Sequence, residues 1–166
     1  MMMNVDNLVA QQEIRDVLIR YTRGIDRMDP ELVTSCYWPG AHDDHGAFQG
    51  TVERFVEWVQ QALAYFDTTM HFIGNQLVEV DGDAAHAESY CVAYHRRATR
   101  DNEQGHDLVI GLRYIDRMER KDNEWRIADR KCAFDWTRHD PINAKWDLPP
   151  EALRGSRDRS DPVYLR

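Results

Sequence analysis

The sequence predicts an α+β domain in which helices come first and a mainly antiparallel sheet follows. Up to about residue 66, apolar residues recur at steps of three and four, as in amphipathic helices, whereas after residue 69 apolar and polar residues alternate between hairpin turns. Helices and strands in this order form a layer of helices on one face of a sheet. A chain of 166 residues fits one such domain, because domains typically contain about 100–200 residues.

Three helices are predicted before the sheet begins. The first extends from about Asp6 to Met28, with its apolar residues on one face. The second starts at Asp29-Pro30, an N-cap followed by a first-turn proline, and is predicted to continue from Glu31 to Tyr37, until Pro39-Gly40 ends it. The third covers Thr51 to Phe66, with Thr51 as a suitable cap.

Alternation predicts strands at residues 72–80, 85–97, 108–115 and 125–136. Asp81-Gly82-Asp83 and Lys121-Asp122-Asn123 have the composition of hairpin turns, and the polar segment 101–105 is a third turn. Long strands tend to coil when one face wraps around helices, and a coiled sheet with helices across its mouth leaves a pocket. The architecture therefore predicts a small-molecule cavity.

The composition narrows the classes of function. With 21 Lys and Arg against 29 Asp and Glu, the net charge of -8 would repel nucleic acid, and no basic stripe is visible. The apolar stretches are far shorter than the roughly 20 residues that span a bilayer, and the N-terminus has no signal-peptide pattern. We therefore expect a cytoplasmic protein that binds neither nucleic acid nor membranes. Three cysteines, Cys36, Cys91 and Cys132, lack CxxC spacing, which favours buried thiols.

Five segments of the sequence combine polar and aromatic residues in a recognisable way. They are Tyr21 with Asp26, the loop Asp43-Asp44-His45-Gly46, the strand opening 70–75 (MHFIGN), the segment 93–96 (AYHR) and residues 125–136 (WRIADRKCAFDW). Together they resemble the SnoaL-like branch of the nuclear transport factor 2 superfamily, which includes scytalone dehydratase, bile acid 7-alpha-dehydratase and hexachlorocyclohexane dehydrochlorinase. The resemblance implies a cone-shaped, cystatin-like α+β barrel. In it, N-terminal helices and a strongly curved, mixed sheet enclose one deep pocket, often in a dimer or trimer.

The domain that carries this resemblance is expected to cover residues 1–138. Residues 139–166 contain four prolines among polar residues, which excludes regular structure over most of the segment. Its apolar residues, Trp146 and Tyr164 among them, predict an extended arm that packs on the barrel or on a neighbouring subunit. A flexible tail is the alternative, because residues 155–161 are strongly charged.

The resemblance implies that His71 is the general base of a catalytic site. Asp26 would accept the other ring proton of His71 and stabilise the imidazolium that forms. The residues alone also allow a strand-end histidine and a solvated acid, because Asp26 lies well off the apolar stripe of its helix. A hydrogen bond between the two side chains would favour the catalytic interpretation.

Tyr21 and His95 complete the expected catalytic set. Tyr21 would donate a hydrogen bond to a substrate carbonyl or a leaving oxygen, with a role in the core as the alternative. His95 would protonate a leaving hydroxyl, and it shares its strand face with small residues that leave room for a ligand: Ala87, Ser89, Cys91 and Ala93. Tyr21 stands where the dehydrochlorinase has a lysine, which favours dehydration over loss of halide.

Three further residues are expected to contact the substrate: Arg130, His45 and Cys91. Arg130 would bind a carboxylate or a developing enolate, with an ion pair to Asp129, Asp135 or another surface acid as the alternative. His42 and His45, with the two acids between them, also admit a metal ion. No third imidazole or cysteine is near them in the sequence, so we expect neither a metal nor another cofactor.

These residues predict a cofactor-independent lyase of the dehydratase type, or an isomerase, that acts on a small hydrophobic cyclic compound. The alternative is a non-catalytic small-molecule-binding or accessory domain with the same fold. The outer face of the sheet, with Tyr90, Val92 and Tyr94, predicts a homo-oligomer, either a dimer or a trimer.

Overall fold

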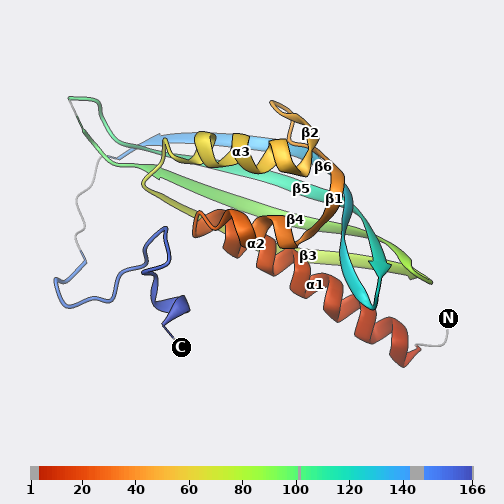
Figure 1. The fold of residues 1–166 in the computed structure, drawn as a ribbon. Helices are drawn as coiled ribbons and strands as arrows, with labels where there is room; N and C mark the ends of the chain where they lie inside the picture. The colour runs from red at the N-terminus through yellow and green to blue at the C-terminus, as the bar shows by residue number, and fades with distance from the viewer. Residues whose placement is uncertain (1–3, 101, 143–147, 166) are drawn as a thin grey trace.

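Helices cover one face of a mixed sheet, and the C-terminal tail lies at one end (Figure 1). The structure, a computed structural model, describes residues 4–100, 102–142 and 148–165, and these contain three α-helices, six paired strands and one short 3-10 helix. The strand order is β2-β1-β6-β5-β4-β3. Neighbouring strands are antiparallel except β1 and β6, which are parallel. The predicted α+β arrangement is confirmed.

The helices begin at residues that favour helix starts. α1 (Val5–Asp26) is capped by Asn4, and α2 (Pro30–Ser35) follows Asp29, whose carboxylate accepts a hydrogen bond from the backbone N–H of Leu32. α3 (Val52–Leu63) follows Thr51 and buries one apolar face. No helix among the described residues is long and apolar enough to cross a membrane.

The second helix is shorter than predicted, and it is followed by a strand that the sequence pattern did not reveal. β1 (Tyr37–Asp44) pairs in parallel with β6, and β2 (Gln49–Thr51) pairs with β1. Pro39, which has no N–H, and Gly40, with φ of +72°, lie in the irregular stretch between the paired residues Tyr37 and His42. The Pro39-Gly40 pair therefore interrupts a strand and does not end a helix.

The four long strands are present and extend beyond the alternating segments. They are β3 (Thr68–Asp81), β4 (Ala84–Arg97), β5 (His106–Lys121) and β6 (Glu124–Pro141), so that β6 continues past the predicted end at Trp136. In β4, Cys91, Ala93 and His95 are buried and Tyr90 and Tyr94 are exposed, as the alternation predicted. The side chains of Cys91 and His95 therefore point toward the helices.

The interior between the helices and the sheet contains charged side chains as well as an apolar core. α1 contributes a buried stripe, and it contacts β3 and β6. Asp43, Asp116 and Arg130 are also buried. Burying a charged group costs free energy unless it is paired. Buried charged groups are common at functional sites, so this interior is the candidate functional region.

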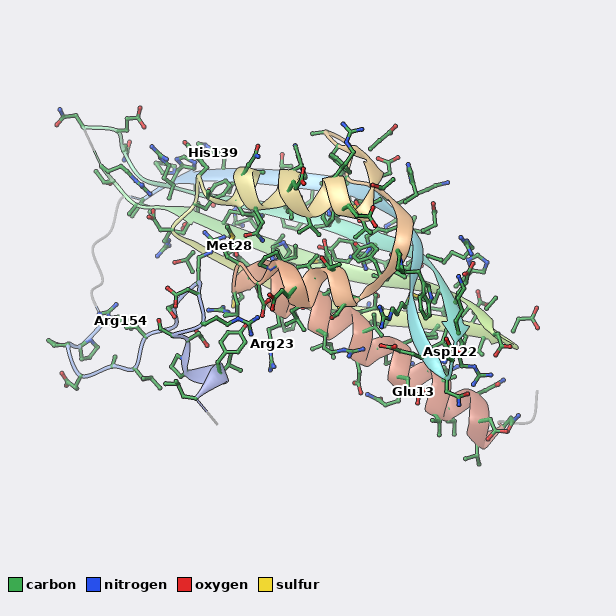
Figure 2. The ribbon with its side chains drawn as sticks, in the orientation of Figure 1. Glu13, Arg23, Met28, Asp122, His139 and Arg154 are labelled. Carbon is green, nitrogen blue, oxygen red and sulfur yellow. The ribbon has the colours of Figure 1, made fainter. Side chains whose placement is uncertain are left out.

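The described part of the tail, residues 148–165, lies near the C-terminal end of α1 and the start of α2, on the side where Arg23 and Met28 are labelled (Figure 2). Arg27 donates hydrogen bonds to the Ser156 carbonyl (2.6 Å) and to Asp161 (3.0 Å). The Tyr164 hydroxyl donates to Asp29 (2.8 Å). Trp146, which we expected to anchor the arm, lies outside the described residues. The tail thus contacts the end of the barrel where α1 ends.

Candidate active site

Asp26 and His71 form a hydrogen-bonded pair where α1 ends against β3. Asp26 Oδ1 is 2.7 Å from His71 Nδ1, and Asp26 Oδ2 accepts the backbone N–H of His71 at 2.9 Å. The Thr69 hydroxyl also donates to Oδ1, at 3.0 Å. Since a carboxylate only accepts, Nδ1 carries a proton, and Nε2 is the nitrogen that this tautomer leaves as an acceptor.

The environment keeps Asp26 in its charged form. Burial raises the pKa of this carboxyl, but the hydrogen bonds and charge of His71 and the hydrogen bond from Thr69 together lower it below its usual range. The side chains of His71 and Asp26 are only 8% and 10% exposed. Asp26 therefore remains an anion at neutral pH and can stabilise a proton acquired by His71.

His95 adjoins the Asp26–His71 pair at the edge of its ring. The two imidazole centroids are 5.5 Å apart, and Phe66 packs on the other side of His95. Burial and the nearby His71 charge lower the pKa of His95 to about 4, so it is neutral at neutral pH. Its Nδ1 lies 3.3 Å from the Leu108 carbonyl oxygen, which can only accept, so Nε2 is left as an acceptor. This geometry does not suit the proton-donating role expected for His95.

A second imidazole–carboxylate pair, formed by His45 and Asp43, lies where β1 ends, next to Tyr21 of α1. His45 Nδ1 is hydrogen-bonded to Asp43, which also accepts the Tyr37 hydroxyl at 2.7 Å. Tyr21 has its hydroxyl 3.4 Å from His45 Nε2, and the His45 ring stacks on Phe55. Burial raises the pKa of both tyrosines well above the usual value, so both are neutral phenols. Tyr21 thus belongs to the His45 cluster and not to the His71 pair.

Arg130 is paired inside the protein. Its Nε and Nη2 donate to the two carboxylate oxygens of Asp116 at 2.6 and 2.8 Å, and both side chains are fully buried. The guanidinium lies over the rings of Tyr21 and Tyr114. Asp116 therefore occupies the edge that we expected to bind a substrate carboxylate, and this partner is a buried acid, not Asp129, Asp135 or another surface acid.

Cys91 is on the inner face of β4, between the two clusters. It is two residues from Ala93, which pairs with His71 across the strands, and its own partner in β5 is Leu112. Burial raises the pKa of the thiol to about 11, so Cys91 is a neutral, small side chain at neutral pH. It can border a ligand but is a poor nucleophile.

The two histidines considered for a metal have different carboxylate partners. His42 Nδ1 is 3.5 Å from Asp129, whereas His45 is bound to Asp43. Within residues 4–100, 102–142 and 148–165, no group of three or more His, Cys, Asp or Glu side chains is arranged to hold a metal ion.

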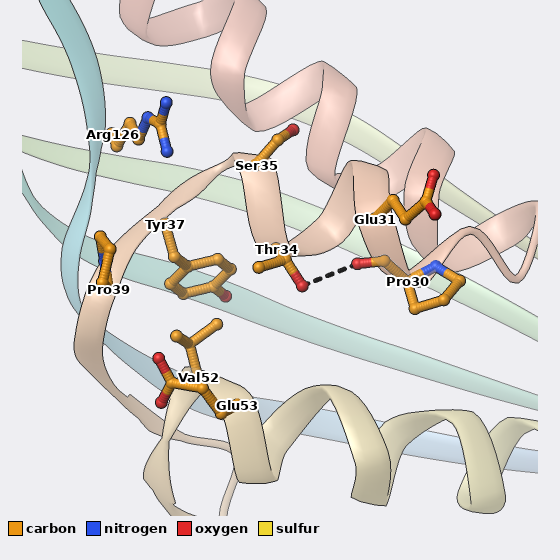
Figure 3. Close-up of a pocket in the computed structure, with 9 residues that line it drawn as sticks. All are labelled: Pro30, Glu31, Thr34, Ser35, Tyr37, Pro39, Val52, Glu53 and Arg126. Atoms are coloured by element: carbon orange, nitrogen blue, oxygen red, sulfur yellow. Dashed lines mark hydrogen bonds between the residues drawn. The ribbon is translucent and has the colours of Figure 1, made fainter.

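Several cavities lie near the residues described above. One, of about 650 Å³, lies between the tail and β3–β4, and its lining includes His95, Met70 and Leu148. Another, of about 480 Å³, is the groove between α2, β1 and the start of α3, where Tyr37 and Glu53 are labelled (Figure 3). The first reaches His95, but it is lined mainly by outer-face residues of β3 and β4, such as Met70 and Tyr94, and so lies outside the sheet. Asp26 lines a third cavity, of about 400 Å³, between α1 and the tail.

The fold and the paired interior side chains define an α+β barrel protein of the cystatin-like class. The chain belongs to the SnoaL-like domain family, which matches residues 6–131. The resemblance recognised in the sequence is therefore confirmed.

Several known proteins are similar to this chain. An uncharacterized protein of Mycobacterium tuberculosis (strain ATCC 25618 / H37Rv) is 29% identical over 137 residues, which cover 79% of this chain and 91% of that protein. A solved structure of hexachlorocyclohexane dehydrochlorinase LinA-type3 from Novosphingobium barchaimii has a TM-score of 0.72 at 18% identity, covering 88% of this chain and 99% of that one. A Novosphingobium aromaticivorans protein assigned as a scytalone dehydratase has a TM-score of 0.72 at 19% identity, covering 87% and 100%. At these identities, the two solved structures establish the fold alone.

Sequence reasoning missed several residues that complete the two clusters. Thr69 shares the strand face of His71, so alternation could have suggested it. Asp116 pairs with Arg130 across β5 and β6, a register that no local pattern specifies. Arg157, in the tail, donates a hydrogen bond to the Leu63 carbonyl oxygen at the end of α3. No sequence pattern around Arg157 indicates that it contacts this part of the fold.

Proposed function

We propose that this protein is a cofactor-independent lyase that removes water from a small hydrophobic cyclic compound, with His71 as the general base. The hydrogen bond from His71 Nδ1 to Asp26 is the observation that carries this proposal. It fixes the tautomer, orients the ring and leaves Nε2 to accept a proton. The names of the two similar solved proteins, a dehydratase and a dehydrochlorinase, describe eliminations from adjacent carbons, which agrees with this chemistry.

In the proposed reaction, His71 Nε2 takes a proton from the carbon next to a carbonyl group of the substrate. The electrons of that C–H bond form the new carbon–carbon double bond, and the C–O bond at the neighbouring carbon breaks. The imidazolium then returns the proton to the departing hydroxide, so that water leaves and His71 is again neutral. Asp26 stabilises the imidazolium during these steps. An isomerisation would use the same base but return the proton to another carbon of the substrate.

The other residues support the substrate in this proposal. His95 is neutral, and its Nε2 can accept a hydrogen bond from a substrate hydroxyl. Cys91 and Ala93 are small inner-face residues that would border the ring. His45 is the weaker candidate for the base, because its Nε2 faces the Tyr21 hydroxyl.

Dehydration of a panel of cyclic β-hydroxy ketones tests the proposal, with the absorbance of the conjugated enone as the readout. The wild-type protein should form enone from at least one member, His71→Ala should lose at least about 100-fold of that rate, and Asp26→Asn should lose a substantial part of it. Asp16→Asn, an exposed acid on the same helix, is the matched control and should leave the rate unchanged. Ligand binding by the wild type without any turnover would favour the binding-domain alternative, and equal rates in wild type and His71→Ala would contradict the proposal.

A further inference from the structure

Arg157, in the C-terminal tail, is held at the end of the barrel where α3 finishes. Its Nη1 donates to the carbonyl oxygens of Leu63 (3.0 Å) and Phe66 (2.5 Å). The Phe66 ring in turn packs on His95, with centroids 5.0 Å apart. The tail thereby brings a guanidinium next to the His71–His95 site from a segment more than sixty residues away in sequence.

The other edge of this guanidinium is buried without a partner. Nε and Nη2 of Arg157 are both shielded from solvent and make no hydrogen bond to any described residue. Asp26 is the nearby carboxylate that affects the Arg157 charge most. Its two oxygens, however, already accept three hydrogen bonds from His71 and Thr69. Buried donors that lack acceptors destabilise a protein, so a group that supplies two acceptor oxygens would be bound favourably there.

The same edge of arginine binds carboxylates elsewhere in this protein. Arg96 uses Nε and Nη2 to bind both oxygens of Asp107, each at 2.6 Å, and Arg130 binds Asp116 in the same way. The two N–H groups on this edge are parallel and match the spacing of carboxylate oxygens. Arg157 presents this edge with no acidic side chain bound to it among the described residues.

Two carboxylates, Asp26 and Asp67, act on the Arg157 charge, and both already accept hydrogen bonds from other groups. Arg27 is a nearby cation that acts on Arg157, and its own partner is Asp161, at 3.0 Å. The Arg157 charge reaches His95, where it acts with burial and His71 to lower the imidazole pKa.

We propose that the Nε and Nη2 edge of Arg157 binds a carboxylate group of the substrate, so that the substrate class is a small cyclic hydroxy ketone that also carries a carboxylate. This inference rests on the proposed function, because it assigns the second recognition element of the same site. The bound carboxylate would fix the ring, with the C–H next to its ketone carbonyl directed toward His71. The tail then acts as part of the binding site and determines which substrates the barrel accepts.

Binding of matched acids and amides tests this inference by isothermal titration calorimetry. The probes are benzoate, cyclohexanecarboxylate and 1-naphthoate, each compared with its neutral amide. At least one acid should bind the wild-type protein roughly tenfold or more tightly than its amide. Arg157→Gln should abolish this preference. Arg157→Lys retains a cation that can reach the same carbonyls but lacks the paired donors, so it should lose most of the preference.

Arg159→Gln is the matched control, because Arg159 is on the same tail but pairs with Asp29 and Glu31 on α2. It should keep the preference for the acid. Limited proteolysis of the tail shows whether Arg157→Gln and Arg157→Lys still dock it, and a loss of preference in Arg157→Lys with a docked tail supports the recognition role. No preference for any acid in the wild type, or an undiminished preference in both Arg157 variants, would overturn the inference.

Because binding is measured without turnover, the result is independent of the elimination assay. If the protein prefers acids through Arg157 but dehydrates no substrate, the anion site is supported and the proposed lyase function is contradicted. If the protein dehydrates neutral ketones but shows no preference for acids, the lyase function is supported and the role of Arg157 is contradicted.

Discussion

The Asp26 carboxylate is both a catalytic candidate and a structural link between α1 and β3. It accepts hydrogen bonds from Thr69 and from both the side chain and the backbone of His71. These donors favour the charged form, so the folded state binds a proton at Asp26 less readily than the unfolded chain does. The arrangement therefore stabilises the protein above the ordinary Asp pKa of 3.8 and loses that effect as the pH falls below it.

Asp26→Asn should lower the free energy of unfolding at pH 7 by about 1–3 kcal/mol, because it weakens charge-assisted hydrogen bonds to a buried acceptor. The difference from the wild type should shrink as the pH falls below about 4. Urea denaturation at pH 7 and at pH 3 measures both effects. Equal stability of the two proteins at pH 7 would show that Asp26 does not stabilise this junction.

His95 should make stability depend on pH in a different range. Its pKa is lowered from 6.5 to about 4 by burial, so protonation opposes folding. The stabilising contribution of the neutral ring is present above pH 6.5 and is lost as the pH falls toward 4, by up to about 3 kcal/mol. His95→Gln should flatten the stability profile between these values, whereas His86→Gln, an exposed histidine on the outer face of the same strand, should not. A wild-type profile that is already flat there would contradict a neutral His95.

The individual site residues could be predicted only in part from the sequence. Helix geometry alone placed Asp26 off the apolar stripe of α1, and its link to His71 followed from the family resemblance. The substrate-binding expectation for Arg130 failed to anticipate Asp116, because the pair depends on the register between β5 and β6. Ion pairs of this kind are set by tertiary structure, which local spacing does not encode.

Among the elements, those with a strong local period were predictable. The buried stripe of α1 and the alternation in β4 were both confirmed. β1 was missed because Pro39 and Gly40 are strong local signals for a break, whereas the strand is formed by parallel pairing with β6, far away in sequence. Asp43 and Asp44 are the last residues of this strand, and His45, directly after it, is hydrogen-bonded to Asp43.

The tail should contribute measurably to stability. Deletion of residues 143–166 removes the hydrogen bonds that Arg27 and Asp29 make with Ser156, Asp161 and Tyr164. With net contributions of about 1 kcal/mol per hydrogen bond and about 2–4 °C per kcal/mol for a chain of this size, the Tm should fall by about 4 °C or more. Differential scanning calorimetry measures the shift.

Tyr164→Phe isolates one of these contacts, because only the hydroxyl that binds Asp29 is lost. It should reproduce a fraction of the effect, about 1 kcal/mol. A deletion that leaves the Tm unchanged would show that the tail does not stabilise the barrel.

At the scale of the whole molecule, the outer face of the sheet carries an apolar row across four strands. Phe72, Val92, Gly111 and Trp136 are consecutive partners from β3 to β6. Phe72 is 64% exposed and Trp136 is 48% exposed, and the Trp136 indole lies directly over Gly111, where a methyl group would collide with it. Contiguous apolar surface of this kind is uncommon on isolated monomers, so we predict that a second copy of the chain covers it.

The double variant Phe72→Ser/Trp136→Ser should shift the protein toward monomer, because it removes two large apolar groups from the proposed interface. Light scattering coupled to size-exclusion chromatography at micromolar concentration measures the molar mass. Leu8→Ser, which changes an exposed apolar residue on α1 (42% exposed), is the control and should not alter the mass. A monomeric wild-type protein would refute the prediction.

The proton abstraction by His71 can be measured without knowing the physiological substrate. In D2O, the protein should accelerate deuterium exchange at the carbon next to the carbonyl of a small cyclic ketone, as followed by proton NMR. His71→Ala should lower the exchange rate at least about 100-fold, to the rate in buffer alone. His45→Ala, which removes the other imidazole–carboxylate pair, should lower the exchange rate much less. Wild-type exchange in His71→Ala, or a loss confined to His45→Ala, would contradict the assignment of His71 as the base.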